Sequence, residues 1–259
     1  MSATPVPDTT AAAPPAGTRP LARLLAQTRI ELLLTLRRGE SVLLTFLIPV
    51  LVLGFFSEVD VLPTPGEPVD FLYPGTIALA VLSTALVSLA IATGFERQMG
   101  VLKRLGVTPL RRSELLGANT LAIVVIEVLQ VAVLTGEALV LGWRPHGVEV
   151  FALLGAIVLA TVAFAGIGLL LAGTLPALTT LAAANGLYLL LLLSGGMIVP
   201  LEKLPGAARA VSRAPPAGAL SDACHGALGG AGVPGRAWLV LAVWAVGAPL
   251  VASRTFRWE

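Results

Sequence analysis

The sequence predicts an all-α membrane protein with six transmembrane helices, an N-terminal amphipathic helix at the membrane interface, and short re-entrant helices between the fifth and sixth spans. Hydrophobic residues make up 56% of the 259 residues and charged residues only 12%. A soluble domain has about a quarter of its residues charged. The apolar residues also fall into runs close to the roughly 20 residues that a helix needs to cross hydrocarbon. The chain is therefore best divided into membrane spans.

The amino-terminal part of the chain divides into two segments. Residues 1–20 are rich in proline and poor in large apolar side chains, which predicts a disordered tail. From Leu21 to Arg38 leucines recur on one helical face, and Arg23 and Gln27 lie on the other. This pattern predicts a helix lying on the membrane surface, with a helix packed on the protein's own core as the alternative. Residues 21–259 then form one transmembrane domain.

Six apolar runs are candidate spans. The first, residues 41–57, is short, and Pro49 near its middle removes a backbone hydrogen bond and bends the helix. The second, residues 74–93, begins with Pro74, because proline is favoured at the first position of a helix. The other four cover residues 115–143, 150–172, 177–200 and 237–252. Between the last two spans, an apolar segment rich in glycine and proline predicts brief helices that enter the bilayer only partway.

Basic residues indicate the orientation, because loops rich in arginine and lysine stay in the cytoplasm. With the amino terminus inside, twelve of the 17 basic residues lie in cytoplasmic segments. The first outer loop, from Glu58 to Tyr73, has four acidic residues and no basic one. We therefore expect a multi-pass protein of the bacterial cytoplasmic membrane with both termini in the cytoplasm. An odd number of spans stays open, because this orientation puts Lys203, Arg209, Arg213 and Arg236 outside.

A basic segment, ERQMGVLKRLGVTPLRR, connects the second and third spans at residues 96–112. Thr108 followed by Pro109 is a typical start for the next helix. The partly apolar face of a short helix is formed by Gln98, Leu102 and Leu105. Attraction to anionic lipid requires only charge, but this segment also has a carboxylate, a glycine and two leucines at fixed offsets. A partner more structured than a lipid surface is indicated.

The same segment resembles the cytoplasmic segment of ABC-type-2 exporter permeases, particularly those of the daunorubicin and multidrug-resistance type. The family pattern E-R-x-x-G-T-L-x-R-L-x-x-T-P-L is matched by Glu96, Arg97, Gly100, Leu102, Arg104, Leu105, Thr108, Pro109 and Leu110. Val101 departs from it, since threonine is usual there, and a hydroxyl is lost. The resemblance implies a coupling helix that docks on a separate ATP-hydrolysing subunit, with the matched residues from Glu96 to Pro109 passing the movement on.

A second stretch, SGGMIVPLEKLPGAARAVSRAPPAGALSDA at residues 194–223, looks like the family's segment after the fifth span. In that family the segment forms short re-entrant helices on the outer side. The resemblance covers most of residues 21–258. It implies a permease that works with two ABC ATPase subunits and a second permease copy or paralogue. Its cargo would be a small hydrophobic or amphipathic compound (a drug, an antibiotic or a lipid-like molecule), exported through a lipid bilayer, and no nucleic acid would be bound.

Motifs for nucleotide binding and for common enzymatic chemistry are missing from the sequence. A P-loop requires G-x-x-x-x-G-K-[ST], and neither Lys103 nor Lys203 follows a glycine. There is no H-E-x-x-H and no G-x-S-x-G motif, and His146 and His225 are expected in outer loops. The lone Cys224 excludes an internal disulfide and a cysteine metal cluster. The chain is thus expected to be a transport subunit without a cofactor or metal, and ATP and Mg²⁺ would bind to the partner subunit.

Polar residues in the third span are candidates for the translocation path. At 100° per residue they fall within an arc of about 80°, and they are Asn119, Glu127, Gln130 and Glu137. Ionisable groups in a span face protein or water and are often functional. Such a stripe either lines a path for cationic or amphipathic cargo or pairs with other spans and holds the bundle together. The resemblance adds Asn185 and Tyr188, three residues apart in the fifth span, because the second and fifth spans commonly line the cavity in this family.

Two other functions stay open at this stage. A secondary transporter driven by an ion gradient would use an ionisable group inside the membrane, and Glu127 is the best candidate for it. A membrane assembly or resistance factor would move no substrate at all.

Overall fold

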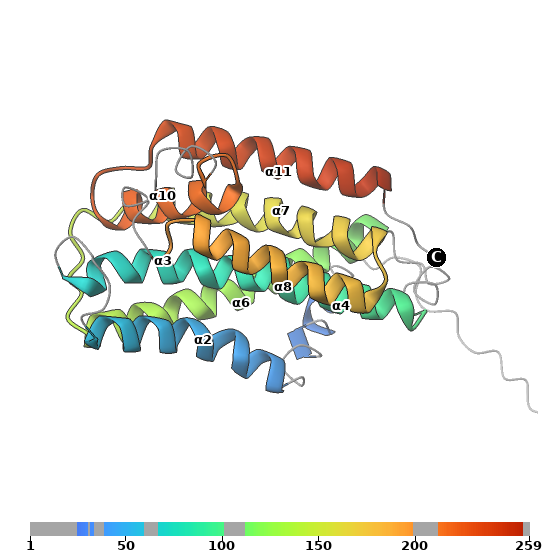
Figure 1. Ribbon diagram of the computed structural model, residues 1–259, viewed down its shortest axis with the longest axis horizontal. Helices are drawn as coiled ribbons and strands as arrows, with labels where there is room; N and C mark the ends of the chain where they lie inside the picture. The colour runs from blue at the N-terminus through green and yellow to red at the C-terminus, as the bar shows by residue number, and fades with distance from the viewer. Residues whose placement is uncertain are drawn as a thin grey trace, which may run out of the picture.

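The computed structural model describes residues 25–30, 32–33, 39–59, 67–100, 112–198 and 212–255. Within these ranges all regular secondary structure is helical, as the sequence predicted. The long helices lie side by side along the long axis of an elongated bundle (Figure 1). The predicted tail and residues 101–111 of the predicted coupling segment lie outside the described residues.

Successive long helices run in opposite directions. The elements are α2 (Gly39–Glu58), α3 (Pro68–Leu82), the π-helical segment η1 (Ser83–Ser88), α4 (Leu89–Gln98), α6 (Arg112–Val140), α7 (Val150–Thr174), α8 (Ala177–Ser194), α10 (Pro216–Leu228) and α11 (Gly235–Thr255). α3, η1 and α4 follow one another without a break and form one long helix. α4 and α11 end at one end of the bundle, here named the α4 end, and α3 begins at the opposite, α3 end (Figure 1).

Five helices among the described residues are long and apolar enough to cross a membrane. They are Pro68–Gln98, Gly117–Val140, Val150–Thr174, Ala177–Ser194 and Gly235–Thr255, and they correspond to the second to sixth predicted spans. The predicted first span lies in α2, where Thr45–Glu58 forms a shorter apolar helix. The chain is a multi-pass membrane protein.

The second span begins earlier than predicted. The helix starts at Pro68, directly after Glu67, whose backbone is extended, and Asp70 lies in the first turn. Proline suits the first helical position because it lacks the amide hydrogen that would go unused there, and an acidic side chain interacts favourably with the positive end of the helix dipole. The prediction that Pro74 starts this helix was therefore wrong, and Pro74 lies inside it.

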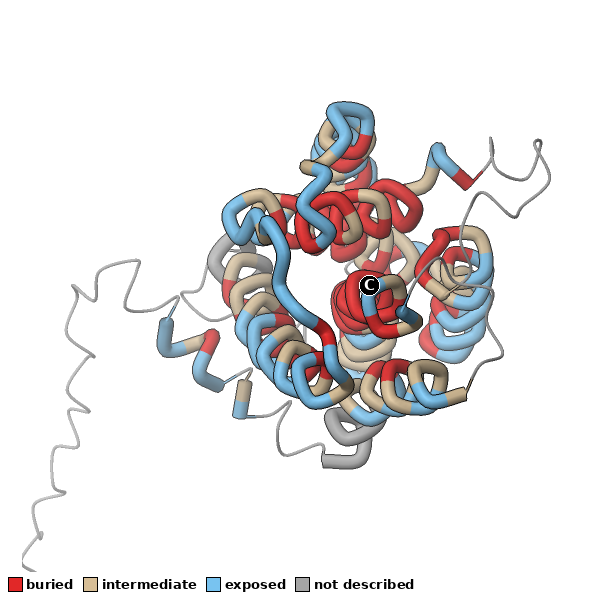
Figure 2. Tube along the Cα trace, turned by 90° about the vertical axis from the view of Figure 1, so that its left-hand side faces the viewer, coloured by how far each residue is buried: buried red, intermediate tan, exposed pale blue. Residues whose placement is uncertain are grey.

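The long helix of α3, η1 and α4 is the centre of the bundle. In its apolar stretch 72% of the residues are buried, against 22% in α8. It packs against α2, α6, α7, α8 and α10, while α11 packs mainly on α7 and α10. Viewed along the bundle, buried residues gather in the middle and exposed residues lie on the outside (Figure 2). A helix that is apolar on every side and enclosed by others forms the core of a membrane bundle.

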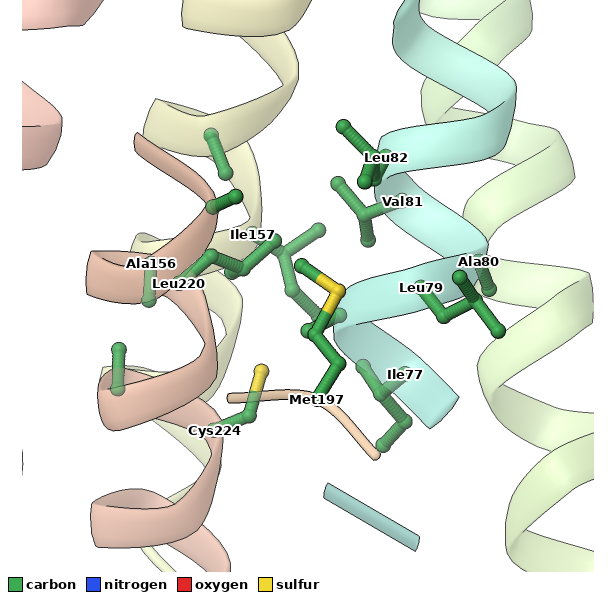
Figure 3. Close-up of a cluster of buried hydrophobic side chains, with 14 of the residues drawn as sticks. Ile77, Leu79, Ala80, Val81, Leu82, Ala156, Ile157, Met197, Leu220 and Cys224 are labelled. Atoms are coloured by element: carbon green, nitrogen blue, oxygen red, sulfur yellow. The ribbon is translucent and has the colours of Figure 1, made fainter. Parts of the chain in front are cut away.

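A close backbone contact joins the central helix to the chain after α8. A Cβ atom at Gly75 would lie 1.8 Å from the carbonyl oxygen of Met197, so only glycine fits. The Met197 side chain is fully buried and lies between α3 and α10, near Leu220 and Cys224 (Figure 3). Burial raises the pKa of Cys224 to about 12. Its thiol is therefore a buried part of the core with little thiolate character.

We predict that Gly75→Ala strongly destabilises the fold, by about 1–3 kcal/mol or more, because overpacking against backbone atoms cannot be relieved by a side-chain movement. The midpoint of thermal unfolding in detergent measures the effect. Gly186→Ala on α8 is the matched control, since among the described residues no atom beyond its chain neighbours and its own helix backbone lies within 4 Å of a Cβ atom there. It should leave the midpoint unchanged or raise it slightly. Equal midpoints for the two variants would show that the contact at Gly75 is not as tight as described.

Candidate functional site

Glu127 joins α6 to α7 in the interior of the bundle. Its side chain is only 1% exposed. The hydroxyl of Thr161 on α7 lies 2.6 Å from Oε2 of Glu127 and 2.8 Å from the carbonyl oxygen of Ile157. Within the described part of the chain, Oε1 of Glu127 has no hydrogen-bond partner. In this conformation Glu127 therefore faces protein and is closed off from solvent.

Gln130, one turn further along α6, joins this helix to two others. The hydroxyl of Thr84 in η1 donates a 3.0 Å hydrogen bond to Oε1 of Gln130. Nε2 of Gln130 donates a 3.1 Å hydrogen bond to the carbonyl oxygen of Thr45 in α2. Thr84 lies in a π-helical segment, a feature found frequently at functional sites. Together, Glu127 and Gln130 connect α6 with α2, η1 and α7, and we refer to these two residues with Thr84 and Thr161 as the polar core.

Glu137 lies near the α3 end of α6, against α2. A Cβ atom at Gly54 would be 3.0 Å from Oε1 of Glu137. Oε2 of Glu137 and the hydroxyl oxygen of Ser57 are both buried, and neither has a hydrogen-bond partner among the described residues. Oδ1 of Asn119, at the other end of α6, is also buried and has no hydrogen-bond partner among the described residues. The predicted stripe thus faces several different neighbours along its length.

Of the two candidates on α8, Asn185 lies on the outer side and Tyr188 packs toward the interior. Asn185 is exposed, and its side-chain amide donates a 2.8 Å hydrogen bond to the carbonyl oxygen of Leu181 in the same helix. Tyr188 is half-buried and packs on the hydrophobic core. α8 is also apolar on its outer side, since Leu189 and Leu193 are 54% and 74% exposed. Asn185 is therefore a polar group on an otherwise apolar outer surface.

A second group of polar contacts lies at the α4 end. Nη1 of Arg97 donates a 2.7 Å hydrogen bond to the carbonyl oxygen of Gly173, and Nη2 donates a 2.5 Å bond to that of Leu175. The hydroxyl of Thr180, in α8, lies 3.3 Å from the same Leu175 oxygen. A Cβ atom at Gly94 would be 3.4 Å from Cγ2 of Thr180. We call these five residues the α4–α7–α8 junction.

Gly100 ends α4 directly after the junction. Its φ of +70° is in the left-handed region that glycine adopts without strain. The amide of Gly100 donates to the carbonyl oxygen of Arg97 at 3.1 Å, and Met99 donates to Phe95 at 2.9 Å. Such bonds satisfy carbonyl groups at the end of a helix. The glycine of the E-R-x-x-G pattern is thus explained by the local backbone.

Of the predicted coupling residues, the structure describes Glu96, Arg97 and Gly100. Glu96 is half-buried beside Arg97. The remaining predicted coupling residues lie outside the described part of the chain, namely Leu102, Arg104, Leu105, Thr108 and Pro109.

The model of the ABC-2 type transporter family matches residues 23–223, which is most of the chain. The chain belongs to the ABC-2 type transporter family. No curated protein matches the sequence. The family assignment makes this ABC-2 protein the permease subunit of an ABC transporter, and it implies association with an ABC ATPase. Members are transport subunits that are typically not catalytic.

Sequence reasoning missed the threonines that partner the polar residues of this ABC-2 permease. Thr161 and Thr84 hold the polar core, and Thr180 completes the junction. Each is a hydroxyl within an apolar run, where threonine often donates to its own helix. The presence of a threonine within an apolar run could have marked these residues as candidates. It does not indicate which helix supplies the partner, because that depends on how the helices pack.

We predict that Thr161→Val lowers the stability of the permease by about 1–3 kcal/mol, because it keeps the shape of the side chain but leaves Oε2 of Glu127 buried without its donor. Thermal unfolding in detergent measures this loss. Thr161→Ser, which retains the hydroxyl, should cost less. In a Glu127→Leu background the effect of Thr161→Val should nearly vanish. Equal losses in both backgrounds would contradict a direct link between the two side chains.

Proposed function

We propose that this ABC-2 permease is the membrane subunit of an ATP-driven exporter of the daunorubicin and multidrug-resistance type in the bacterial cytoplasmic membrane. Its cargo is a hydrophobic or amphipathic compound. The observation that carries the proposal is the placement of the E-R-x-x-G pattern at the α4 end, where the central helix terminates in the junction. A force applied to the residues that follow Gly100 acts directly on the most buried helix of the bundle.

In this proposal the α4 end faces the cytoplasm. α2, which comes before the five long apolar helices in the chain, crosses the membrane in addition to them, so the spans number six. Charged residues support this orientation, because Arg97 and Arg254 lie near the α4 end and Glu58, Glu67 and Asp70 near the α3 end. Basic segments stay in the cytoplasm. α10 then dips in from the outer side. At 13 residues it is too short to cross hydrocarbon, and it packs on α3, α7 and α11.

The translocation path, in this proposal, lies between two permease copies, and each copy binds one ATPase. In the central helix 72% of the residues of the apolar stretch are buried within the chain, whereas in α8 only 22% are. Asn185 supports α8 as a path or contact surface, because a polar side chain is costly against lipid tails and favours protein or water. The polar core then holds the bundle together behind that surface.

The energy for export comes from the ATPase subunits. The chain has no P-loop. ATP can shift the permease between inward-open and outward-open states only because the ATPase that carries it binds the two states unequally. The segment from Glu96 to Pro109 is the place where this difference is passed to the membrane helices.

Reconstitution tests the function. The permease is co-expressed with a candidate stand-alone ABC ATPase from the same genome, and the two are purified together and placed in lipid vesicles. We expect co-purification and ATP-dependent movement of daunorubicin, used here as a fluorescent hydrophobic probe. Movement that continues without the ATPase and stops with an uncoupler would instead identify a secondary transporter. A lack of both co-purification and movement would indicate a non-transporting factor.

We predict that Arg104→Glu lowers ATP-driven transport several-fold without unfolding the permease, because it reverses a charge that would meet the ATPase. Transport per ATP hydrolysed is measured in vesicles, and a thermal unfolding midpoint equal to that of the wild type confirms the fold. Arg144→Glu is the control, since Arg144 is exposed in the loop before α7, at the opposite end. Equal transport by the two variants would argue against the coupling role.

Labelling of single cysteines tests the orientation. Met99 is 61% exposed at the α4 end, and Arg144 is exposed at the α3 end. In intact spheroplasts a membrane-impermeant maleimide should label Arg144→Cys but reach Met99→Cys only after permeabilisation. The native Cys224 does not interfere, because it is fully buried and its pKa is raised. Labelling of Met99→Cys from outside would reverse the orientation and defeat the coupling proposal.

A further inference from the structure

Arg97 makes contacts that its place in the E-R-x-x-G pattern does not predict. A basic residue in a coupling segment would be expected to meet the partner ATPase. In the structure its two terminal nitrogens instead hold the carbonyl oxygens of Gly173 and Leu175, at 2.7 and 2.5 Å. Gly173 belongs to the last turn of α7, and Leu175 follows directly after that helix. One guanidinium group therefore binds two carbonyl groups of the turn that connects α7 to α8.

The carbonyl groups at this point need donors from outside the helix. The last four carbonyl groups of a helix have no partner in it and carry its partial negative charge. Pro176 has no amide hydrogen and holds Leu175 in an extended conformation, with φ −106° and ψ 153°. Arg97 supplies the missing donors together with Thr180, whose hydroxyl lies 3.3 Å from the Leu175 oxygen. A cation is also the favoured charge at the end of a helix.

Packing brings α8 into the same contact. A Cβ atom at Gly94 would lie 3.6 Å from the Cα atom of Ala177, the first residue of α8. α4 therefore touches the first turn of α8 with almost no side chain between them. Gly94 is one turn before Arg97, so a single face of α4 contacts both α7 and α8. The end of the central helix, the end of α7 and the start of α8 form one unit.

We propose that Arg97 is a positioning residue that clamps α4 to the α7–α8 turn, so that a displacement of the coupling segment moves the start of α8. This inference rests on the proposed function, because it assigns the route by which a force from the ATPase reaches α8. Arginine suits the role because its planar fork fills two acceptors at once, whereas the single nitrogen of lysine has no such fixed geometry. The role lies within the permease and adds to any contact that the segment makes with a partner.

The first test uses the purified permease alone. Arg97→Lys should raise hydrogen exchange on the order of tenfold in a peptide over residues 171–181, since a bond to a charged donor is lost. This peptide contains the amides of Leu175 and Thr180, which are hydrogen-bonded to Leu171 and Pro176. Arg254→Lys, an exposed arginine at the same end of the bundle, is the matched control. Unchanged exchange in Arg97→Lys would overturn the clamp, whether or not the protein is an exporter.

The second test uses the permease with its ATPase in vesicles. Arg97→Lys should lower daunorubicin transport per ATP at least about threefold while ATPase binding stays unchanged, because the loss of one charged hydrogen bond is worth tenfold or more in an equilibrium. A disulfide between Gly94→Cys and Ala177→Cys should restore transport to Arg97→Lys, and reduction should abolish the rescue. This pair is chosen because a Cβ atom at position 94 would lie 3.6 Å from the Cα atom of Ala177.

The outcomes separate the clamp from the proposed function. Loss of ATPase binding in Arg97→Lys, with no rescue by the disulfide, would overturn the clamp and make Arg97 a contact for the partner, and the exporter assignment would stand. A wild-type complex that shows no ATP-dependent transport would overturn the exporter assignment and with it the transmission step. Restored transport with the oxidised pair supports both.

Discussion

The fold depends on enclosing one long helix within a membrane, where apolar side chains gain nothing from leaving lipid for protein. Close packing through small residues then replaces the hydrophobic effect as the source of association. Gly75 meets the Met197 carbonyl, and a Cβ atom at Gly168 of α7 would lie 2.9 Å from the carbonyl oxygen of Leu86 in η1. Contacts of this kind bring backbone to backbone. They define where α7 and the chain after α8 must lie, and so they define the position of the junction and of α10.

The polar core follows from the same enclosure. A buried amide or carboxyl group without a partner costs more in hydrocarbon than at a surface, so a polar residue on the central face of α6 needs a donor or acceptor from a neighbour. Thr161 and Thr84 provide these groups without adding charge. Their hydroxyls also suit apolar helices, because each can bond to its own backbone in the absence of a partner. Glu127 and Gln130 thereby determine the position of α6 relative to three neighbouring elements.

The hydropathy of the chain and the helical spacing of its apolar residues were enough to predict an all-helical membrane protein and the approximate position of its spans. Both properties depend on the local sequence alone. The start of the central helix was wrongly predicted at Pro74. Pro68 also suits the first position of a helix, and Asp70 in the first turn interacts favourably with the helix dipole. The E-R-x-x-G pattern was visible, and the left-handed Gly100 accounts for its glycine. The carbonyl partners of Arg97 could not be predicted, because Gly173 and Leu175 are far away in sequence and only the packing of α4 on α7 brings them close.

α8 is the least buried of the five apolar helices among the described residues, yet both of its ends make hydrogen-bonded contacts. Only 22% of its residues are buried. At the start, Arg97 and Thr180 fill the carbonyl groups of the preceding turn, and after its last residue the hydroxyl of Ser221 in α10 donates a 3.0 Å bond to the carbonyl oxygen of Gly196. An α-helix of 18 residues is a rigid rod about 27 Å long. Between its ends α8 packs on η1 and α7 along one side and is exposed along the other. In our proposal it therefore moves as one rigid element that links the α4–α7–α8 junction to α10.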